Sequence, residues 1–320
     1  MKRLLLSLIA LAIPFATVLG IAEWRLSRVR WNEYAAKRSL FERQAAKVEV
    51  LVLGSSHAYR GILPALLGPH AFSFAGVSQS LYYDRAILEK YLDSSPSLKT
   101  VILPISYFTL ESQLDEGIEK WRCYYYRYEY GLRHRDWHMT WSARNYSACF
   151  LGGQELGWKH ILRGKIPDVL SRFDECGGDA TPRSSPETEE TSALAQRLQS
   201  SAQTALQRHH AFMRPGNFEE NRRILDSLVQ ELEHRGIEAV LVTVPVSRYY
   251  AGGMDPVRRQ QMQAALRDIC SSHGARYFNY SADERFFDRD FFDGDHLNHA
   301  GAVKFSRILM EETVAQSRPR

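Results

Sequence analysis

The sequence predicts an α/β protein in which five parallel strands form one sheet with helices on both faces, a three-layer arrangement of the doubly wound type. Three observations favour this fold. Short apolar runs recur near both ends of the chain, helical segments separate them, and no repeat of fixed period is present. Of the 320 residues, 44% are hydrophobic and 24% are charged, so the chain can bury a sizeable core and wholesale disorder is excluded.

Three strands are expected in the first third of the chain. Residues 48–53, 71–75 and 100–105 are short apolar runs rich in β-branched or aromatic side chains, which is typical of buried strands. Residues 78–92 carry apolar side chains at helical spacing and stop before Pro96, which predicts an amphipathic helix between the second and third strands.

The alternation of helices and strands resumes near the C-terminus. Asn217, followed three residues later by Glu220, predicts a capping box at the start of a helix over 217–236. The apolar run 237–246 follows this helix and is expected to be the fourth strand.

The remaining elements complete the fold. Asp255 before Pro256 predicts an N-cap and a first helical residue, and Gly274 marks the end of that helix. Residues 275–280 are expected to be the fifth strand, and 299–314 a closing helix.

The chain begins with a basic dipeptide after the first methionine, and residues 4–22 are then 19 uncharged residues. As a helix this stretch is about 28 Å long at ~1.5 Å per residue, close to the thickness of a bilayer's hydrocarbon core. We expect residues 1–30 to be an uncleaved signal anchor and 24–46 to continue as a helix. Gly20 and Ala22 have the small side chains that a signal peptidase needs, so cleavage stays the alternative.

The net charge bears on partners. The chain carries 41 Lys and Arg against 37 Asp and Glu, a formal charge of +4. This excess is too small for a dedicated nucleic-acid-binding protein unless one face concentrates it, and the sequence indicates no such face. We therefore expect no nucleic-acid partner.

The four cysteines are Cys123, Cys149, Cys176 and Cys270. They lack the C-x-x-C spacing of zinc or thioredoxin-type sites. Outside the cytoplasm some of them can pair, and the alternative of unpaired buried thiols is equally open.

An insertion over 107–215 interrupts the alternation. It contains a cluster of one tryptophan and five tyrosines: Trp121, Tyr124, Tyr125, Tyr126, Tyr128 and Tyr130. We interpret this cluster as a small second core; the alternative is a surface that stacks on sugar rings or lines an acyl groove. Residues 177–192 lack large apolar side chains and are expected to form a flexible loop.

Polar residues that follow strands are the candidates for chemistry, because ligands of doubly wound sheets bind at the carboxyl ends of the strands. Ser56 follows the first strand, two residues after Gly54, and Asp293 and His296 precede the last helix. A serine hydroxyl needs an adjacent base to take its proton, and an imidazole base needs a carboxylate to fix its tautomer. These three side chains can therefore form a nucleophilic site.

The other histidines give no separate site. His134 and His138 are four residues apart, but no Glu follows His134, so both are expected on a solvated face and we predict no metal site. His209 and His210 are likewise expected at the surface. The glycine-rich loops of dinucleotide-binding and phosphate-binding proteins are absent from the sequence, so no cofactor is expected.

Three short motifs resemble those of the SGNH (GDSL-type) hydrolase superfamily. The Gly-Ser-Ser of residues 54–56, Gly76 after the second strand and the Asp293-x-x-His296 pair resemble its blocks I, II and V. This resemblance implies a five-stranded flavodoxin-like sheet in a hydrolase domain over 47–320. An α/β-hydrolase is a poorer match, because several strands precede the nucleophile in that fold.

The resemblance also implies a role for each motif residue. Ser56 would be the nucleophile, His296 the general base and Asp293 the group that orients it. The backbone N–H groups of Ser56 and Gly76 would form part of the oxyanion hole.

The sequence departs from the family pattern at two places. Ser55 replaces the aspartate of block I, and the Gly-x-Asn-Asp of block III is missing together with its oxyanion-donating asparagine. One such donor is worth about 2.7–4 kcal/mol of transition-state stabilisation. Ser106 after the third strand is the expected replacement, and without a replacement activity is low. His57 and Tyr107 are expected to contact substrate.

With its membrane segment, the chain is similar to the D-alanyl-lipoteichoic-acid transfer protein and the alginate O-acetylation proteins. This implies a cell-envelope esterase or O-acyltransferase that forms an acyl-serine intermediate and acts on an acylated glycan or another envelope polymer. It also implies a multi-pass membrane acyltransferase as partner. The alternative is a catalytically inactive binding or scaffolding protein of the same shape in envelope polysaccharide assembly.

These implications favour a single pass through the bacterial inner membrane, with the catalytic domain on the periplasmic side. The flanking charges disagree, because Arg25, Arg28 and Arg30 outnumber Lys2 and Arg3 and by themselves place the body of the protein in the cytoplasm. We follow the basic start and the apolar segment, which together are typical of an export signal.

Overall fold

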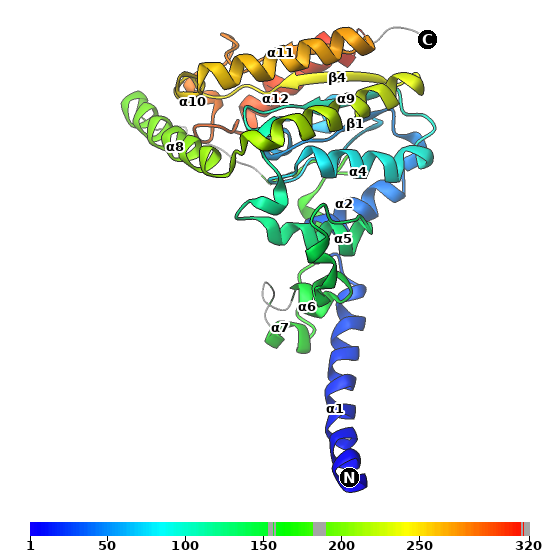
Figure 1. Ribbon diagram of the computed structural model, residues 1–320. Helices are drawn as coiled ribbons and strands as arrows, with labels where there is room; N and C mark the ends of the chain where they lie inside the picture. Colours follow the sequence, from blue (N-terminus) through cyan, green and yellow to red (C-terminus); the bar gives the residue numbers. More distant parts are fainter. Residues whose placement is uncertain (153–155, 157, 182–189, 315, 317–320) are drawn as a thin grey trace. The chain divides into compact units, whose positions relative to one another are not determined.

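The computed structural model (Figure 1) describes the chain except residues 153–155, 157, 182–189, 315 and 317–320, and the side chains of 4–6, 8, 9, 158 and 159. The chain divides into two compact units. Unit 1 consists of Met1–Ser39 and Trp121–Ser171, and unit 2 consists of Leu40–Lys120 and Arg172–Arg320. Only the middle of the expected insertion (107–215) is therefore separate from the unit that holds the sheet.

Unit 2 contains a parallel sheet of five strands in the order β2-β1-β3-β4-β5. The strands are β1 (Val50–Val52), β2 (Ala71–Ser73), β3 (Thr100–Pro104), β4 (Glu238–Thr243) and β5 (Arg276–Asn279). Each lies within the run that predicts it, so the α/β fold with a five-stranded parallel sheet is confirmed. This strand order is the flavodoxin-like one, in which ligands bind at the switch point between β1 and β3.

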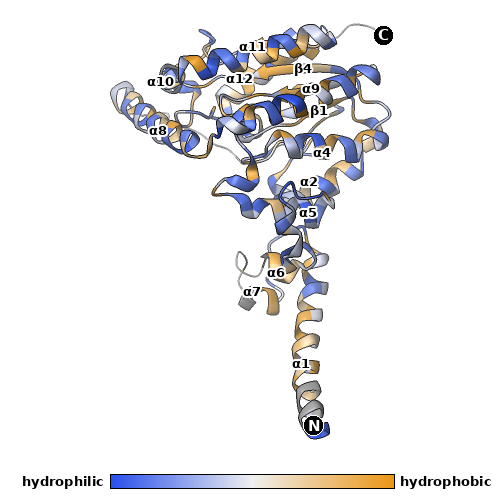
Figure 2. Ribbon diagram, in the orientation of Figure 1, coloured by the Kyte–Doolittle hydropathy of each residue, from blue (hydrophilic) through white to orange (hydrophobic). Residues whose placement is uncertain are grey.

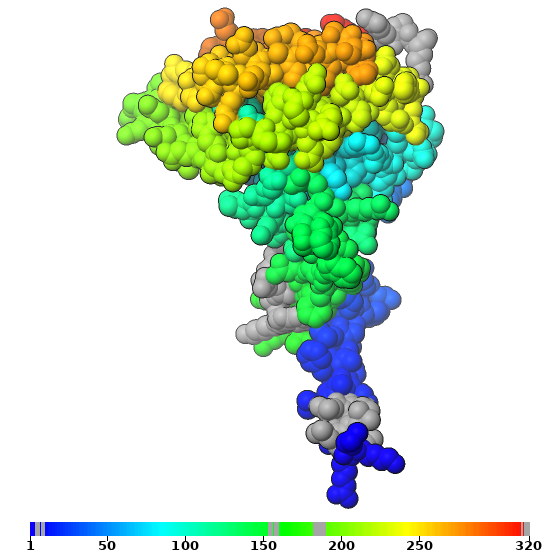
Figure 3. Space-filling view, in the orientation of Figure 1, coloured from blue at the N-terminus to red at the C-terminus, as the bar shows by residue number. Residues whose placement is uncertain are grey.

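Helices cover both faces of this sheet. On one face α4 (Leu81–Tyr91), α9 (Phe218–His234) and α11 (Pro256–His273) lie side by side, and α3 (Ser56–Gly61) packs against α12 (His299–Leu309). A right-handed crossover places α3 on the opposite face, because the chain moves from β1 to β2 in one direction along the sheet and from β2 through β3 to β5 in the other. α12 follows β5 and lies on that same face, because it packs against α3. In Figure 3, α9 and α11 form much of the visible surface of unit 2.

Two helix starts test the predicted caps. Asp255 caps α11 as expected, because its Oδ1 atom accepts hydrogen bonds from the N–H groups of Val257 and Arg258 at 2.8 and 3.1 Å. Asn217 does not cap α9, and its side-chain amide donates to Glu116 Oε2 at 2.7 Å instead. The predicted capping box is therefore wrong, although the helix is present.

The core of unit 2 is aromatic at the β2 edge of the sheet. The ring of Phe41, near the end of α2 (Glu33–Glu42), lies 5.0 and 4.7 Å from the rings of Phe72 and Phe74. Phe74 also stacks on Tyr91 of α4 at a centroid distance of 5.0 Å. All four rings are buried, so this cluster joins α2 and α4 to β2.

A long helix that is absent from the sequence-based prediction, α8 (Thr191–Phe212), belongs to unit 2 and packs against α10 (Arg248–Gly253). Its buried side chains follow helical spacing: Leu194, Leu198, Ala202, Ala205, Leu206 and His209. α8 therefore extends unit 2 well into the expected insertion. Half of the predicted flexible loop (177–192) lies outside the described residues.

Unit 1 contains the tyrosine cluster. Its helices are α1 (Lys2–Ser27), most of α2, α5 (Cys123–Tyr130), α6 (Ala148–Gly152) and α7 (Trp158–Leu162). Tyr34 of α2 lies against Tyr125, Tyr126 and Tyr130 of α5, with ring centroids 5.2, 4.9 and 6.0 Å apart. These three α5 rings are at most 3% exposed, which confirms a second core for three of the six clustered residues; Tyr124 and Tyr128 are half-buried and Trp121 is exposed. None of the four cysteines forms a disulfide bond in this structure, and three of them are buried while Cys176 is half-buried, so the alternative without disulfides holds.

α1 is the candidate membrane segment. Its part Ala10–Ser27, with a mean hydropathy of 1.2, is long and apolar enough to cross a membrane, and no other helix among the described residues is; a signal sequence has the same properties. Figure 2 shows hydrophobic residues along this helix. α1 ends at Ser27 and α2 begins at Glu33, so the single helix expected over 24–46 is interrupted.

Candidate active site

Ser56 is the first residue of α3 and lies just beyond the carboxyl end of β1. Gly54 has a φ of 103°, and an added Cβ would lie 3.2 Å from Pro104 Cδ, so this turn requires glycine. The Gly54 N–H donates to Asp84 Oδ1 at 2.8 Å, and the same oxygen accepts a hydrogen bond from the Gln79 amide at 2.6 Å. The buried Asp84 side chain thus holds the turn that presents Ser56.

The second segment of the site is the turn that precedes α12. Asp293 Oδ1 accepts hydrogen bonds from the backbone N–H groups of Asp295 and His296 at 3.1 and 2.9 Å. An aspartate side chain that bonds to the backbone two and three residues on fixes a tight turn. The same carboxylate can therefore shape the loop and face the His296 ring.

Gly294, inside this turn, lies against α8. Its N–H donates to Ser201 Oγ at 2.8 Å, and its carbonyl oxygen accepts a hydrogen bond from Ser247 Oγ at 2.6 Å. An added Cβ would lie 2.3 Å from the Cα atom of Ala202, so no side chain larger than hydrogen fits here without movement. α8 therefore holds the turn in place.

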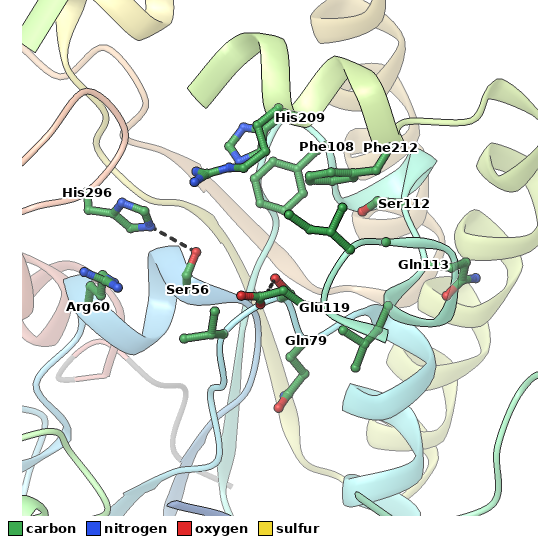
Figure 4. Close-up of a pocket in the computed structure, with 16 residues that line it drawn as sticks. Ser56, Arg60, Gln79, Phe108, Ser112, Gln113, Glu119, His209, Phe212 and His296 are labelled. Carbon is green, nitrogen blue, oxygen red and sulfur yellow. Dashed lines mark hydrogen bonds between the residues drawn. The ribbon is translucent and has the colours of Figure 1, made fainter. Parts of the chain in front are cut away.

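The structure brings together the three side chains of the expected nucleophilic site. His296 Nε2 lies 3.0 Å from Ser56 Oγ (Figure 4), and His296 Nδ1 lies 2.9 and 3.1 Å from the two carboxylate oxygens of Asp293. Ser56 and His296 are 240 positions apart and meet at the carboxyl edge of the sheet. The distances are those of a nucleophile bonded to a base, and of a base bonded to a carboxylate.

A fourth side chain in the site, Asp295, is absent from the predicted set. Its side chain is 3% exposed, and its Oδ1 atom lies 3.3 Å from His296 Nδ1. Its Oδ2 atom lies 3.4 Å from His57 Nε2 and 3.7 Å from His209 Nε2. The Arg208 guanidinium lies 3.5 Å from the same oxygen. One buried carboxylate therefore faces three imidazoles and a guanidinium.

Burial and charge shift the pKa values in this cluster. Burial lowers the pKa of His57 and brings the pKa of His209 well below its usual range. For His296 burial acts in the same direction, but hydrogen bonds to Asp293 and Asp295 and their charges outweigh it and raise the pKa. Burial would raise the pKa of Asp295, yet hydrogen bonds from His296 and His57 hold it far below its usual range. The cluster thus favours an ionised Asp295 with neutral His57 and His209.

The remaining histidines lie outside the site or differ from expectation. His209 is 4% exposed and its Nδ1 atom pairs with the Tyr250 hydroxyl at 2.6 Å, so the expected surface position is wrong for this residue. His210 is exposed, as expected. His134 pairs with an asparagine and His138 with an aspartate, at 2.7 and 2.8 Å.

Three predicted site residues lie away from the space beside Ser56. His57 is buried, and its Nδ1 atom pairs with Ser106 Oγ at 2.9 Å. Tyr107 is 3% exposed, and its hydroxyl oxygen accepts a hydrogen bond from the Asp255 N–H at 3.0 Å. None of the three lines the pocket at Ser56. The structure therefore does not place His57 and Tyr107 as substrate contacts or Ser106 as an oxyanion donor.

The two expected backbone donors of the oxyanion hole differ in their hydrogen bonding. The Gly76 N–H donates to the Gly54 carbonyl oxygen at 3.0 Å and is therefore engaged, contrary to expectation. The Ser56 N–H makes no hydrogen bond to another described residue. It belongs to the first turn of a helix, where backbone N–H groups have no partner within the helix.

Ser56 and His296 open onto a pocket of about 210 Å³, drawn in Figure 4. Its apolar lining residues are Val77, Phe108, Leu114, Ile118 and Phe212, and its charged ones are Arg60, Glu119 and Arg208. A pocket of this composition can take an apolar group next to the serine together with polar or anionic groups.

His57, Asp295 and His296 are also the one group of three potential metal ligands among the described residues, with ligand atoms within 4.8 Å of one another. The ring nitrogens of His296 face Ser56 and Asp293. A metal ion here would compete with the hydrogen bonds that orient His296, so this donor set fits proton transfer better than metal binding.

Asp295, Arg208 and His209 are the residues that sequence reasoning missed. Asp295 stands in an Asp-Gly-Asp-His run, where nothing local shows that both carboxylates face the imidazole. Arg208 and His209 lie on α8, whose apolar spacing was the available signal.

Comparison with known proteins gives no further assignment. The chain matches no protein-family model and no curated protein. The fold and the geometry of the site are therefore the basis for a function.

Proposed function

We propose that this protein is a membrane-anchored serine acyl enzyme, an esterase or an O-acyltransferase of the SGNH type. One observation carries the proposal: His296 lies within hydrogen-bond distance of both Ser56 Oγ and the Asp293 carboxylate, at 3.0 and 2.9 Å. The flavodoxin-like strand order and the position of Ser56 directly after β1 support the SGNH relationship, because the motif resemblance implies both.

The geometry suits formation of an acyl-serine. Ser56 Oγ attacks the carbonyl carbon of an ester while His296 Nε2 takes its proton, and Asp293 stabilises the resulting imidazolium through Nδ1. The tetrahedral intermediate then expels the alcohol, which receives the proton from His296, and the acyl group stays on Ser56. Water or an acceptor hydroxyl attacks this ester with His296 again as base, which frees Ser56. Water as acceptor makes the enzyme an esterase, and a glycan hydroxyl makes it a transferase.

The oxyanion of this intermediate needs hydrogen-bond donors. The Ser56 N–H at the start of α3 is the donor that the structure leaves available, while the Gly76 N–H is bonded to Gly54. Loss of one donor costs about 2.7–4 kcal/mol of transition-state stabilisation, so we expect slow turnover.

For substrate and location we propose an acylated glycan or another envelope polymer, reached from the periplasmic side, with a multi-pass membrane acyltransferase as partner. The apolar and charged walls of the pocket support an acyl ester of a polar molecule, and α1 supports attachment to a membrane. Alkaline phosphatase is active only outside the cytoplasm, so we expect a fusion of this enzyme to the C-terminus of the chain to be active. A fusion that is intact but inactive overturns the periplasmic placement.

The decisive experiment is covalent labelling of the full chain in detergent with a fluorophosphonate probe, alongside hydrolysis of p-nitrophenyl acetate. Ser112→Ala is the matched control, because Ser112 also lines the pocket. We expect wild type and Ser112→Ala to label and Ser56→Ala to lose labelling and hydrolysis together. Equal labelling of wild type and Ser56→Ala overturns the proposal.

A non-catalytic binding or scaffolding protein is the second candidate. Engagement of the Gly76 N–H and the position of Ser106 away from the pocket favour it. An unlabelled wild type that still binds an acylated polymer supports this candidate over the first.

A further inference from the structure

Unit 1 differs from unit 2 in its charge and in its tryptophan content. All six tryptophans of the chain fall within unit 1. Unit 1 carries 15 Lys and Arg against 6 Asp and Glu, a formal charge of +9, whereas unit 2 carries 26 against 31, a formal charge of −5. The small net charge of the whole chain hides this asymmetry between the two units.

The C-terminal end of α1 is built into unit 1. The Glu23 carboxylate accepts hydrogen bonds from the backbone N–H groups of Ala148 and Cys149, at the start of α6, at 2.7 and 3.1 Å. The Arg25 guanidinium donates to the carbonyl oxygen of Leu162 in α7. α6 and α7 therefore lie directly beside the end of the candidate membrane segment.

Large apolar side chains are exposed on α1 and elsewhere on unit 1. Along the membrane segment the exposed ones are Leu11, Ile13, Phe15, Val18, Ile21 and Trp24. Outside α1 we define the aromatic surface as six side chains that are 39% to 81% exposed: Trp121, Trp137, Trp141, Tyr146, Phe150 and Leu162. Figure 2 shows hydrophobic residues on α6 and α7 as well as on α1. Several large apolar side chains exposed on one small unit favour an interaction site there.

Arginines accompany two of the exposed tryptophans. The Arg28 guanidinium lies 4.5 Å from the centroid of the Trp24 ring, and the Arg122 guanidinium lies 4.5 Å from that of Trp121. Tryptophan is enriched where a protein crosses the headgroup region of a bilayer, because its ring is apolar and its N–H is polar. Lys and Arg near that region are attracted by anionic lipids.

We propose that the aromatic surface of unit 1 lies in the headgroup region of the bilayer that α1 enters, and that anionic lipids hold it there. Lipid is the occupant because α6 and α7, which carry the exposed side chains of Phe150 and Leu162, both pack against the candidate membrane helix α1. Lys2 and Arg3 stand at the other end of α1; without them unit 1 has 13 Lys and Arg against 6 Asp and Glu, and this formal charge of +7 complements an anionic lipid surface. This inference does not depend on the chemistry proposed for Ser56.

Tryptophan fluorescence of the full chain in lipid vesicles tests the proposal, because all emission comes from unit 1. The emission of Trp137 and Trp141 is the difference between wild type and the double variant Trp137→Phe/Trp141→Phe. We expect lipids brominated near the headgroup to quench most of this difference, and aqueous iodide to quench little of it. Both side chains are exposed, and the single variant Trp141→Phe repeats the measurement if the double variant fails to fold.

The matched control is Phe287→Trp, an exposed position in unit 2. Its added emission should be quenched by iodide and not by brominated lipid. If iodide quenches the emission of Trp137 and Trp141 and brominated lipid does not, the proposal is overturned. The aromatic surface would then be open to water in the presence of lipid, and a protein partner, which the vesicles do not contain, would be its expected occupant.

The role of charge has its own test. Arg133, Arg163 and Lys165 are exposed on unit 1, and we expect brominated-lipid quenching of Trp137 and Trp141 to be stronger in anionic than in zwitterionic vesicles. Replacing the three cations by Gln should reduce this difference, because it removes three of the positive charges of unit 1. Equal quenching of wild type in both kinds of vesicle overturns the requirement for anionic lipid.

Discussion

The Asp295 carboxylate lies 3.3 Å from His296 Nδ1, the ring nitrogen that also faces Asp293 at 2.9 Å. The Asp293 side chain is 28% exposed and that of Asp295 is 3% exposed, so water screens the first carboxylate far more than the second. One carboxylate is enough to fix the tautomer of an imidazole. The second adds buried negative charge beside the base, and it belongs to the same network as His57 and His209.

The rate of Ser56 labelling should rise with pH through a midpoint above 6.5, the ordinary pKa of histidine, because these carboxylates raise the pKa of His296. The base must be neutral to take the serine proton, so activity is lost as pH falls below the raised pKa. Asp295→Asn removes one negative charge and should lower the midpoint. Fluorophosphonate labelling rates measured from pH 5 to 9 give both midpoints. A flat profile, or an unchanged midpoint in the variant, contradicts this account.

Asp293→Asn should slow labelling on the order of 10³–10⁴-fold, because an amide at this position favours the wrong tautomer of His296. Asp295→Asn, with Asp293 intact, should slow it far less. Single-turnover labelling at one pH above both midpoints separates the two variants. Equal losses would show that Asp295 and not Asp293 orients the ring.

Gly294→Ala should disturb the turn that carries Asp293 and His296, because the new Cβ would lie 2.3 Å from the Cα atom of Ala202. Overpacking of this kind destabilises by about 1–3 kcal/mol. Gly252→Ala is the matched control, since nothing lies within 4 Å of its added Cβ. Thermal unfolding and labelling rate measure the effect, and a variant that matches wild type in both would show that α8 does not constrain the turn.

The strands and the three central site residues could be predicted from the sequence because their signals are local. Buried parallel strands are continuous apolar runs, and ligand-binding residues follow them directly. Ser56 stands after β1, and the pair Asp293 and His296 stands before α12. Their meeting then follows from the sheet topology.

The rest of the site depends on long-range contacts that leave no local pattern. Asp295 faces Arg208 and His209 only because α8 packs against the turn that holds Asp295. The Gly76 N–H is bonded because its turn lies against Gly54, which the sequence near either glycine does not show. Unit 1 combines two segments that are far apart in the chain, so its excess of positive charge could not be seen before the units were known.

Asp84 should make the protein less stable as pH rises from about 4 to about 6. Burial raises its pKa from 3.8 to about 6, so the folded state holds a proton in this window that the unfolded state has lost. The free energy of unfolding then falls with rising pH, by about 3 kcal/mol at 1.36 kcal/mol per pKa unit. Asp84→Asn keeps an acceptor for Gly54 and should abolish this dependence. Denaturation of the full chain in detergent from pH 4 to 7 measures the free energy of unfolding at each pH, and Asp268→Asn, at an exposed position, is the control. If the free energy of unfolding changes with pH equally in wild type and Asp84→Asn, this account of Asp84 is refuted.

Glu23→Ala should loosen α6, because the Glu23 carboxylate accepts hydrogen bonds from Ser147 Oγ at 2.8 Å and from the N–H groups of Ala148 and Cys149. Each buried donor left without a partner costs about 1–3 kcal/mol. Hydrogen exchange of residues 147–152 in the full chain should therefore speed up by about tenfold or more. Glu42→Ala, at an exposed position, is the control. Because α1 supplies this carboxylate, we expect the mature wild-type protein to keep its N-terminal segment, which mass spectrometry of the intact chain measures. Unchanged hydrogen exchange in Glu23→Ala would mean that α1 does not support α6.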